Sequence, residues 1–493
     1  ENFWNSKLRI AIIGVSVILI LTSIILIPVY LTKKSHNDSD DDEAVNVIFM
    51  ISDGFGPASQ SFARYCIGEN MTKPGTLALD GILVGTVQTY SSDSDVTDSA
   101  AGATAYSCAM KTYNGAIGVD PSVTPCGTML EAMKSKGFRT ALVVTSRITH
   151  ATPASFSSHV QWRDYEEYIA QQQVEIVQPD IMLGGGLKEF QNRSDGVDLF
   201  AKAASLGYHT LTTKSQFFSE KLKMPLLGLF AYDHMSFEID RDNTTQPSLA
   251  EMVTKTLELL ESDEKAKKNG FFLMIEGSRI DMAGHNNDAS AHLHDIWAYN
   301  DAVQVVLNYV KTKKKTIVIS TSDHETGGLT LGRNNPYGTY PTYVWYPEVV
   351  KQVLKSTEFM CDLIMQQGNS SIASVVETYG KVNLTQSEIE KVENNTYSLS
   401  SCARTIGDML AQRANIGWTT WGHTGTDINL YSAGYSSENL RGNHNNVEVG
   451  RFVADLLDLD LEKATQSVSG VNPYPPQNSK RSAPEYTDHT FDH

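Results

Sequence analysis

Continuous apolar runs alternate along the chain with amphipathic stretches that have helical periodicity. Four of the runs are typical of strands buried on both faces, and they span 45–52, 138–146, 270–278 and 315–322. The helical patterns that precede the last three runs span 128–137, 247–261 and 298–310. Strands alternating with helices predict an α/β fold. We expect a three-layer sandwich, with a mostly parallel central sheet and helices on both faces.

Two regions interrupt this alternation. Residues 337–414 carry three N-x-S/T triplets and two cysteines, and we expect an inserted smaller subdomain there. Toward its end the chain becomes polar and proline-rich, so we expect a flexible C-terminal tail at 461–493. The main domain is then expected at 45–460.

Residues 10–31 contain no charged side chain. A helix of this length rises about 1.5 Å per residue and is long enough to cross a bilayer. We therefore expect a transmembrane anchor, preceded by a short cytoplasmic flank at 1–9 and followed by an acidic linker at 32–44. A buried core helix is the alternative, and the lack of a polar face argues against it.

The chain after this segment carries features of an oxidising, lumenal compartment. Seven N-x-S/T triplets begin at Asn37, Asn70, Asn192, Asn243, Asn369, Asn383 and Asn394. Their density favours a glycoprotein body, and hence a single-pass type II membrane protein with a lumenal domain. The five cysteines predict one or two disulfides and at least one unpaired thiol, with buried thiols as the alternative. No CxxC spacing supports a cysteine-ligated zinc site.

The formal net charge is −17. Such a surface repels nucleic acid, so we do not expect a nucleic-acid partner. An anionic substrate requires a local reversal of this field, which metal ions and a well-placed arginine would supply.

Reactive side chains follow each of the four predicted strands. The strand ends lead to Asp53, to His150 and Thr152, to Glu276, Asp281 and His285, and to Asp323 and His324. In open α/β sheets the ligand site lies outside the carboxyl ends of the strands, so we expect these side chains at one edge. A single carboxylate in such a place would be an ordinary turn residue or helix cap. Four strand ends together predict divalent cations, because crowded buried carboxylates repel one another.

The stretch Asp95–Ala105, DVTDSAAGATA, places Ser99 directly after Asp98 and follows it with small side chains. Small residues allow a helix that begins here to approach a metal centre closely. A serine hydroxyl held by a cation is a nucleophile without a protein base, and the N–H groups at a helix start attract an anion. The alternative is that Asp98 only caps the helix and Ser99 is its first polar residue.

Six motifs occur in the order in which alkaline phosphatases carry them. They are SDGFG, TDSAAGATA, HATPAS, EGSRIDMAGH, SDHETGG and WGHTGTD. The chain therefore resembles the alkaline phosphatase family over 45–459, and its anchor and acidic linker resemble the vacuolar, membrane-anchored members of fungi. The resemblance implies a phosphomonoester hydrolase, a homodimer, and a vacuolar membrane location with the catalytic domain in the lumen.

The resemblance also implies roles for individual residues. Ser99 resembles the nucleophile that becomes phosphoserine, and Arg163 resembles the arginine that binds two phosphate oxygens. Two zinc ions and one magnesium ion per subunit are implied. The ligands implied are Asp281, His285 and His423 for the first zinc, Asp53, Asp323 and His324 for the second, and Asp53, Thr152 and Glu276 for magnesium. By itself, Arg163 would instead be expected to pair at the surface with Asp164 or Glu167.

Two positions depart from other family members and leave the metal preference open. His150 stands where some bacterial members carry Asp, and Met282 where others carry Lys or His, which alters the surroundings of magnesium and phosphate. Small phosphomonoesters are the expected substrates, with phosphopeptides as further candidates.

Three alternative functions are weighed against this one. A related metal hydrolase, such as a phosphodiesterase or phosphomutase, would use a similar site. A sulfatase is disfavoured because Ser99 does not stand in a C/S-x-P-x-R setting. A membrane glycoprotein whose metals only hold the fold is disfavoured by Ser99 and Arg163. A transport or adhesion role lacks charged residues in the membrane segment.

Overall fold

The computed structural model describes residues 44–68, 73–334 and 338–476. Within these residues ten strands form one sheet, in the order β12-β2-β11-β8-β1-β7-β3-β4-β6-β5. Neighbouring strands are parallel, except that β11 runs antiparallel to β2 and β8. The strands are β1 (Asn46–Ile51), β2 (Leu83–Gln88), β3 (Arg139–Arg147), β4 (Ile181–Gly185), β5 (His209–Leu211), β6 (Leu226–Leu229), β7 (Phe271–Glu276), β8 (Thr316–Thr321), β11 (Ile428–Gly434) and β12 (Gly442–Asn445). The expected mostly parallel sheet is confirmed.

Both faces of the central strands are buried. In β1, Val47, Phe49 and Ile51 enter one hydrophobic core, whereas Ile48 and Met50 enter another on the opposite face. The helices over the Ile48 face are α2 (Pro57–Ile67), α10 (Leu249–Ser262) and α13 (Ala289–Thr312). Those over the Phe49 face are α3 (Ser99–Ser107), α4 (Met129–Ser135), α5 (Ala151–Ser157), α6 (Glu166–Gln172), α8 (Leu199–Ser205) and α19 (Asn446–Leu456). Helices on both faces explain why the strands have continuous apolar sequences.

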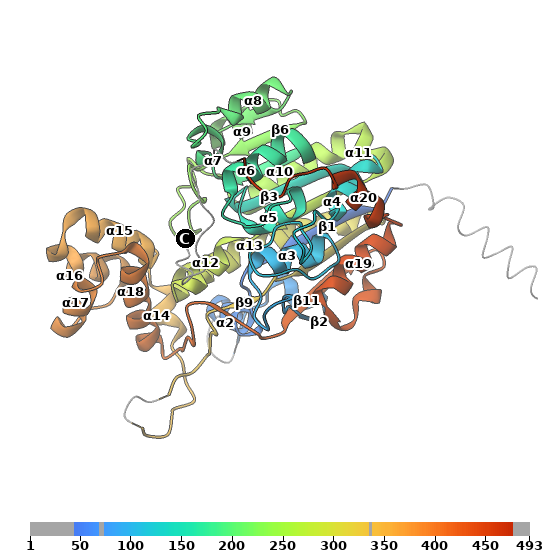
Figure 1. The fold of residues 1–493 in the computed structure, drawn as a ribbon. Coiled ribbons are helices and arrows are strands. Elements are labelled where there is room, and N and C mark those ends of the chain that lie inside the picture. Colours follow the sequence, from blue (N-terminus) through green and yellow to red (C-terminus); the bar gives the residue numbers. More distant parts are fainter. Residues whose placement is uncertain (1–43, 69–72, 335–337, 477–493) are drawn as a thin grey trace, which may run out of the picture. The chain divides into compact units, whose positions relative to one another are not determined.

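A group of helices with its own hydrophobic core lies within 337–414, where the sequence predicts an inserted lobe. These helices, orange in Figure 1, are α15 (Thr357–Gln367), α16 (Ile372–Val375), α17 (Gln386–Glu393) and α18 (Leu399–Ala414). Helix α14 (Pro347–Lys351) precedes them, and its Val350 belongs to the core on the Ile48 face of the sheet. Met360, Ile364 and Ile406 are buried in this core, and a disulfide joins α15 to α18 there. The remaining helices outside it are α7 (Lys188–Gln191), α9 (Lys214–Ser219), α11 (Glu264–Asn269), α12 (Arg279–His285) and α20 (Leu461–Val468).

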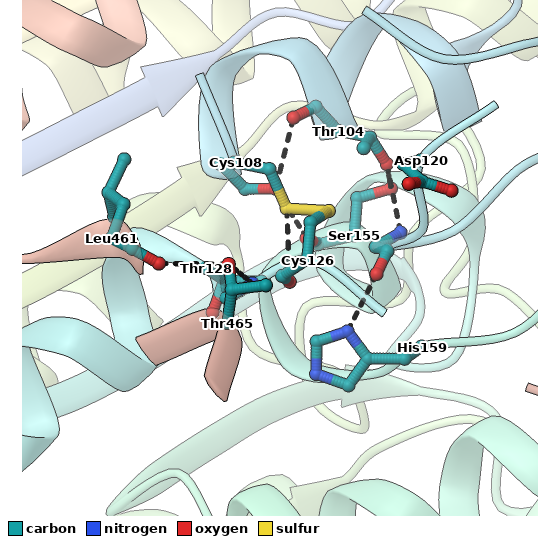
Figure 2. Close-up of a disulfide and its surroundings, with 12 residues drawn as sticks. Thr104, Cys108, Asp120, Cys126, Thr128, Ser155, His159, Leu461 and Thr465 are labelled. Atoms are coloured by element: carbon teal, nitrogen blue, oxygen red, sulfur yellow. Dashed lines mark hydrogen bonds between the residues drawn. A yellow bond between two sulfur atoms is a disulfide. The ribbon is translucent and has the colours of Figure 1, made fainter. Parts of the chain in front are cut away.

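The five cysteines form two disulfides and leave one thiol, as expected. The pairs are Cys108–Cys126 and Cys361–Cys402, and Cys66 is buried and unpaired. Burial raises the pKa of the Cys66 thiol to about 12, so this group is not ionised at neutral pH. Figure 2 shows the first disulfide, which closes the loop between the end of α3 and the start of α4.

A buried ion pair supports the same loop. The Nε2 atom of His159 lies 3.1 Å from the Glu131 carboxylate. Its Nδ1 atom donates to the Gly118 carbonyl at 2.7 Å, which is the dashed bond from the His159 ring in Figure 2. Burial by itself lowers the pKa of His159, but the Glu131 carboxylate and the Gly118 carbonyl raise it above its usual value. Burial likewise opposes ionisation of Glu131, but His159 and Thr128 hold the pKa of this carboxyl below its usual value.

We predict that His159→Gln destabilises the protein more at pH 6 than at pH 9. A histidine whose pKa is higher in the folded protein than in the unfolded chain stabilises the fold fully at pH values below the unfolded pKa of about 6.5. That stabilisation is lost as the pH rises through the pKa of the folded protein. Glu131 remains ionised over this window, since its folded pKa is lowered. Breaking a buried pair costs about 3 kcal/mol, which a melting curve at each pH resolves. His209→Gln, which removes a more exposed partner of Glu220, is the matched control. A deficit that is equal at both pH values, or larger at pH 9, contradicts the prediction.

A packed helix occupies part of the segment expected to be a flexible tail. Ala464 and Val468 of α20 are buried, and the Thr465 hydroxyl accepts a hydrogen bond from the Gly127 amide at 2.8 Å. The apolar residues of this helix are few and spaced along one face, so its composition resembles that of a polar tail. Residues 477–493 lie outside the described residues.

None of the helices in the described residues is long and apolar enough to cross a membrane. The expected anchor at 10–31, its flank at 1–9 and the linker as far as residue 43 lie outside the described residues.

Candidate active site

The carboxyl ends of three adjacent strands deliver acidic side chains to one place. Strand β1 lies between β7 and β8 and is parallel to both. Asp53 follows β1, Glu276 ends β7, and Asp323 follows β8. All three carboxylates are fully buried. The expected gathering of these side chains at one sheet edge is therefore observed.

Helix α3 brings Ser99 to this edge. Asp98 is the N-cap and accepts a hydrogen bond from the Ala101 amide at 2.9 Å, and Ser99 is the first residue of the helix. The Ser99 Oγ atom lies 3.1 Å from His324 Nε2. A Cβ atom at Gly102 would lie 3.1 Å from the Cβ of Asp323, so glycine permits this close approach. Asp98 thus caps the helix while Ser99 faces the site.

Asp53, Asp323 and His324, which we call the serine cluster, surround a common point with Ser99. The His324 Nε2 atom lies 3.5 Å from an Asp53 oxygen and 3.2 Å from an Asp323 oxygen. In a serine–histidine–aspartate triad the carboxylate holds Nδ1, on the far side of the ring from the serine. Here both carboxylates and the serine approach Nε2, which can donate only one hydrogen. This arrangement is that of ligands around a cation.

Asp281, His285 and His423 form a second group, the histidine cluster. Asp281 and His285 are four residues apart on α12, and their side chains meet at 3.3 Å, as their spacing predicts. His285 Nδ1 donates to the Trp421 carbonyl at 2.5 Å, and His423 Nδ1 donates to the Thr97 carbonyl at 2.8 Å. These bonds direct both Nε2 atoms into the cluster, where they lie 3.1 Å apart. Two imidazole nitrogens so close together beside a carboxylate form a ligand set for a cation.

A third group, the threonine cluster, contains Asp53, His150, Glu276 and Thr152. Ligand atoms of the first three lie within 4.8 Å of one another, so Asp53 is shared with the serine cluster. Thr152 is buried on α5. The Glu276 carboxylate is oriented by the Ser278 hydroxyl, which donates to it at 2.7 Å.

Several buried oxygens of these clusters lack a hydrogen-bond partner among the described residues. They are both Asp53 oxygens, Thr152 Oγ1, Glu276 Oε1 and Asp323 Oδ2. A buried polar atom without a partner costs stability, so an unpartnered set converging on one place fits bound cations. Oxygen and imidazole donors of this kind suit zinc and magnesium.

The electrostatics of the carboxylates agree with this assignment. Burial, reinforced by the carboxylates of Asp323 and Asp281, raises the pKa of Asp53 well above its usual range. Burial also raises the pKa of Glu276 to about 7. Burial opposes ionisation of Asp281 too, but the neighbouring imidazoles, His285 foremost, hold its pKa well below the usual range. Bound cations would offset both the burial and the repulsion between carboxylates that raise the pKa values of Asp53 and Glu276.

Arg163 points into the same site rather than to the surface. Its side chain is mostly buried, forms an ion pair with Asp98 at 3.0 Å, and approaches His150 Nε2 at 3.0 Å. The alternative that Arg163 pairs with Asp164 or Glu167 is not what the structure shows: its ion-pair partner is Asp98, and the Glu167 carboxylate binds Ser194 instead. The guanidinium is thus held beside the residue that precedes Ser99.

His150, which the sequence placed at this edge but not among the implied metal ligands, belongs to the threonine cluster. The structure also adds a residue that sequence reasoning did not place in the site. Thr326 Oγ1 donates to Asp281 at 2.5 Å and lies 3.2 Å from His324 Nδ1, so it orients ligands of two clusters. Its place in the SDHETGG motif was the available signal. Met282 lies outside the clusters, because its side chain packs with Phe237 and accepts from Arg279.

The family model described as Alkaline phosphatase matches residues 44–459. The chain belongs to the alkaline phosphatase family. The repressible alkaline phosphatase of Saccharomyces cerevisiae is 42% identical over 474 residues, which cover 86% of this chain and 83% of the relative. The resemblance stated from the six motifs is confirmed, and the chain is a hydrolase of this family.

Solved structures of the family share the fold. The crystal structure of Thermus thermophilus alkaline phosphatase matches with a TM-score of 0.76 and 30% identity, covering 86% of this chain and 96% of that one. A histidine-to-aspartate variant of the alkaline phosphatase of the Antarctic bacterium TAB5 matches with a TM-score of 0.62 and 29% identity, covering 85% of this chain and 99% of that one. That structure has Mg bound in the M3 site. A metal-dependent phosphomonoesterase is consistent with these relatives and with the three clusters.

Proposed function

We propose that the chain hydrolyses phosphomonoesters in two steps, through a phosphoserine on Ser99, with two zinc ions and one magnesium ion per subunit. The observation that carries this proposal is the position of the Ser99 hydroxyl. It lies at the start of a buried helix, 3.1 Å from His324 Nε2, beside clusters in which several buried oxygens have no hydrogen-bond partner among the described residues.

We assign one ion to each cluster. Asp281, His285 and His423 would hold the first zinc, Asp53, Asp323 and His324 the second, and Asp53, Thr152 and Glu276 the magnesium. Two imidazoles in the histidine cluster favour zinc, and the oxygens of the threonine cluster favour magnesium. His150 adds a nitrogen to the third position and makes it less selective for magnesium than an all-oxygen set.

The chain's own residues bind the ester and carry the phosphoryl group. When bound, the cations supply positive charge that neutralises the phosphate and lowers the pKa of a hydroxyl or a water. Arg163 donates two N–H groups to phosphate oxygens, and the first amides of α3 face the same anion. Ser99 Oγ attacks phosphorus in line, the P–O bond to the alcohol breaks, and the alcohol leaves with a proton. Water then attacks from the vacated side, releases phosphate and restores the Ser99 hydroxyl.

Monoesters fit this site better than diesters. A monoester dianion has three terminal oxygens, which the guanidinium and the three clusters can share. A diester has two terminal oxygens, one negative charge and a second substituent that must enter the buried site. Small phosphomonoesters are therefore the proposed substrates, with phosphopeptides as further candidates.

We also propose a membrane-anchored glycoprotein with its catalytic domain in the vacuolar lumen. Two disulfides suit an oxidising compartment. The five triplet asparagines within the described residues are exposed, as glycosylation requires, and they are Asn192, Asn243, Asn369, Asn383 and Asn394. The vacuole and the homodimer rest on the family resemblance.

Release of p-nitrophenol from p-nitrophenyl phosphate at mildly alkaline pH tests the proposed activity. Protein stripped by a chelator is expected to be inactive, and zinc together with magnesium is expected to restore turnover. A metal-loaded protein that cleaves a diester or a sulfate ester but no monoester would contradict the substrate class. A protein that cleaves no ester at all would contradict hydrolysis altogether.

We predict that Arg163→Ala raises the inhibition constant of inorganic phosphate about tenfold to a hundredfold, since hydrogen bonds to charged groups are worth about 1.5–3 kcal/mol. The change also leaves Asp98 without its partner beside the anion. Competitive inhibition of p-nitrophenyl phosphate hydrolysis measures the constant. Arg441→Ala, at an exposed position, is the control. An unchanged constant for phosphate would rule out Arg163 as its binding group.

A further inference from the structure

A cavity of about 1740 Å³ lies beside the candidate active site. Its walls come from α18, from residues 330–334 and 341–345, and from residues 417–421. No residue of the three metal-ligand clusters lines it, so it is a separate space. The proposed reaction does not use it.

One wall of the cavity is nevertheless bonded to the histidine cluster. Arg404 Nε donates to the main-chain carbonyl of His285 at 3.1 Å, and His285 Nδ1 donates to the carbonyl of Trp421 at 2.5 Å. Both Arg404 and Trp421 line the cavity. The wall of the cavity is therefore bonded directly to one of the clusters that would hold the phosphate.

The charge of the cavity is opposite to that of the whole protein. Three cationic side chains, Arg333, Lys391 and Arg404, line it with a single carboxylate, Asp408. Arg333 and Lys391 share that carboxylate, at 3.5 and 3.4 Å. Arg404 instead lies over the Trp421 ring, 5.0 Å from its centre. In a chain of net charge −17, this local excess of positive charge favours an anion.

The cavity also presents aromatic rings to solvent. Tyr343, Tyr397 and Trp421 line it with exposed fractions of 87%, 78% and 56%. Exposed aromatic side chains that gather around one hollow mark a binding site more often than a chance surface. A planar ring stacks on such side chains and on a guanidinium.

We propose that this cavity receives the leaving group of phosphomonoesters whose alcohol part is a planar ring with a further negative charge. The ring stacks on the aromatic wall, and the charge meets the three cationic side chains. This inference rests on the proposed phosphomonoesterase activity. It adds a specificity site that is distinct from the residues that bind phosphate.

Three substrates of increasing fit test the proposal: ethyl phosphate, phenyl phosphate and 4-carboxyphenyl phosphate. The double variant Arg333→Gln with Lys391→Gln is expected to lower kcat/KM about tenfold for 4-carboxyphenyl phosphate alone. Tyr397→Leu is expected to lower it for both ring substrates and not for ethyl phosphate. Arg441→Gln with Arg451→Gln removes two exposed arginines outside the cavity and is the matched control. Equal losses on all three substrates, or no loss on the charged ring, would overturn the proposal.

Binding of the alcohol product separates this proposal from the proposed activity. Calorimetric titration with 4-hydroxybenzoate is expected to show binding to the unaltered protein, and binding about tenfold weaker in the double variant. If the protein binds 4-hydroxybenzoate in this way but hydrolyses none of the three esters, the cavity assignment stands and the activity fails. If it hydrolyses ethyl phosphate but shows no binding of 4-hydroxybenzoate, the cavity assignment fails alone.

Discussion

Ser99→Ala is expected to lower kcat/KM for p-nitrophenyl phosphate at least about a thousandfold while leaving the bound metal unchanged, because it removes the attacking oxygen and no proposed metal cluster. The Ser99 hydroxyl is 3.1 Å from His324 Nε2, and Asp98, the residue before it, forms the ion pair with Arg163. Steady-state kinetics and elemental analysis of the same sample measure both quantities.

Ser107→Ala is the matched control for this experiment. Ser107 lies at the opposite end of the same helix, is equally buried, and donates to the Ser155 carbonyl at 2.6 Å. Replacing Ser107 removes the donor to the Ser155 carbonyl, which costs stability, but it removes no atom from the site. A Ser99→Ala protein that keeps a tenth or more of its activity, or that loses its metal, would contradict a nucleophilic role.

Asp53→Asn is expected to have the next largest effect, because Asp53 is shared by two clusters. Asparagine keeps the volume of the side chain but removes its charge and one acceptor oxygen. We expect affinity for two of the three ions to fall by at least about a hundredfold, and hydrolysis to fall with it. Elemental analysis after dialysis against metal-free buffer counts the ions that remain.

Glu276→Gln distinguishes loss of a shared ligand from general damage. Glu276 belongs only to the threonine cluster, so its replacement is expected to lose one ion rather than two. Both substitutions remove a buried carboxylate at the end of neighbouring strands, and their effects on folding should be similar. Equal metal content in the two variants would contradict the sharing of Asp53.

The central strands were predictable because burial on both faces leaves an unmistakable pattern. Strands β1, β3, β7 and β8 are apolar runs. Three of them lie within the ranges expected from the sequence, and β3 ends one residue beyond its range, at Arg147. The edge strands carry no such signal. Strand β12 has the sequence GNHN and is largely exposed, while β5 has three residues. Their pairing depends on neighbours that are distant in the sequence.

The site was predictable to the extent that its ligands follow strand ends. Ser99, Asp281 and His324 could be named because the motifs around them are specific and the sheet brings them together. Contacts made through the main chain could not be predicted from the sequence. The carbonyls of Trp421 and Thr97, which fix the tautomers of His285 and His423, have no sequence signature.

Peptide mapping of the enzyme, quenched by acid during turnover of p-nitrophenyl phosphate, tests the central claim most directly. The account predicts one phosphoryl group per modified chain, on Ser99, and none in the Ser99→Ala protein. The label should disappear when quenching follows exhaustion of the substrate, because water then restores the hydroxyl. Steady turnover with no phosphorylated Ser99 at any quench time, or with the label on another residue, would contradict a phosphoserine mechanism at this site.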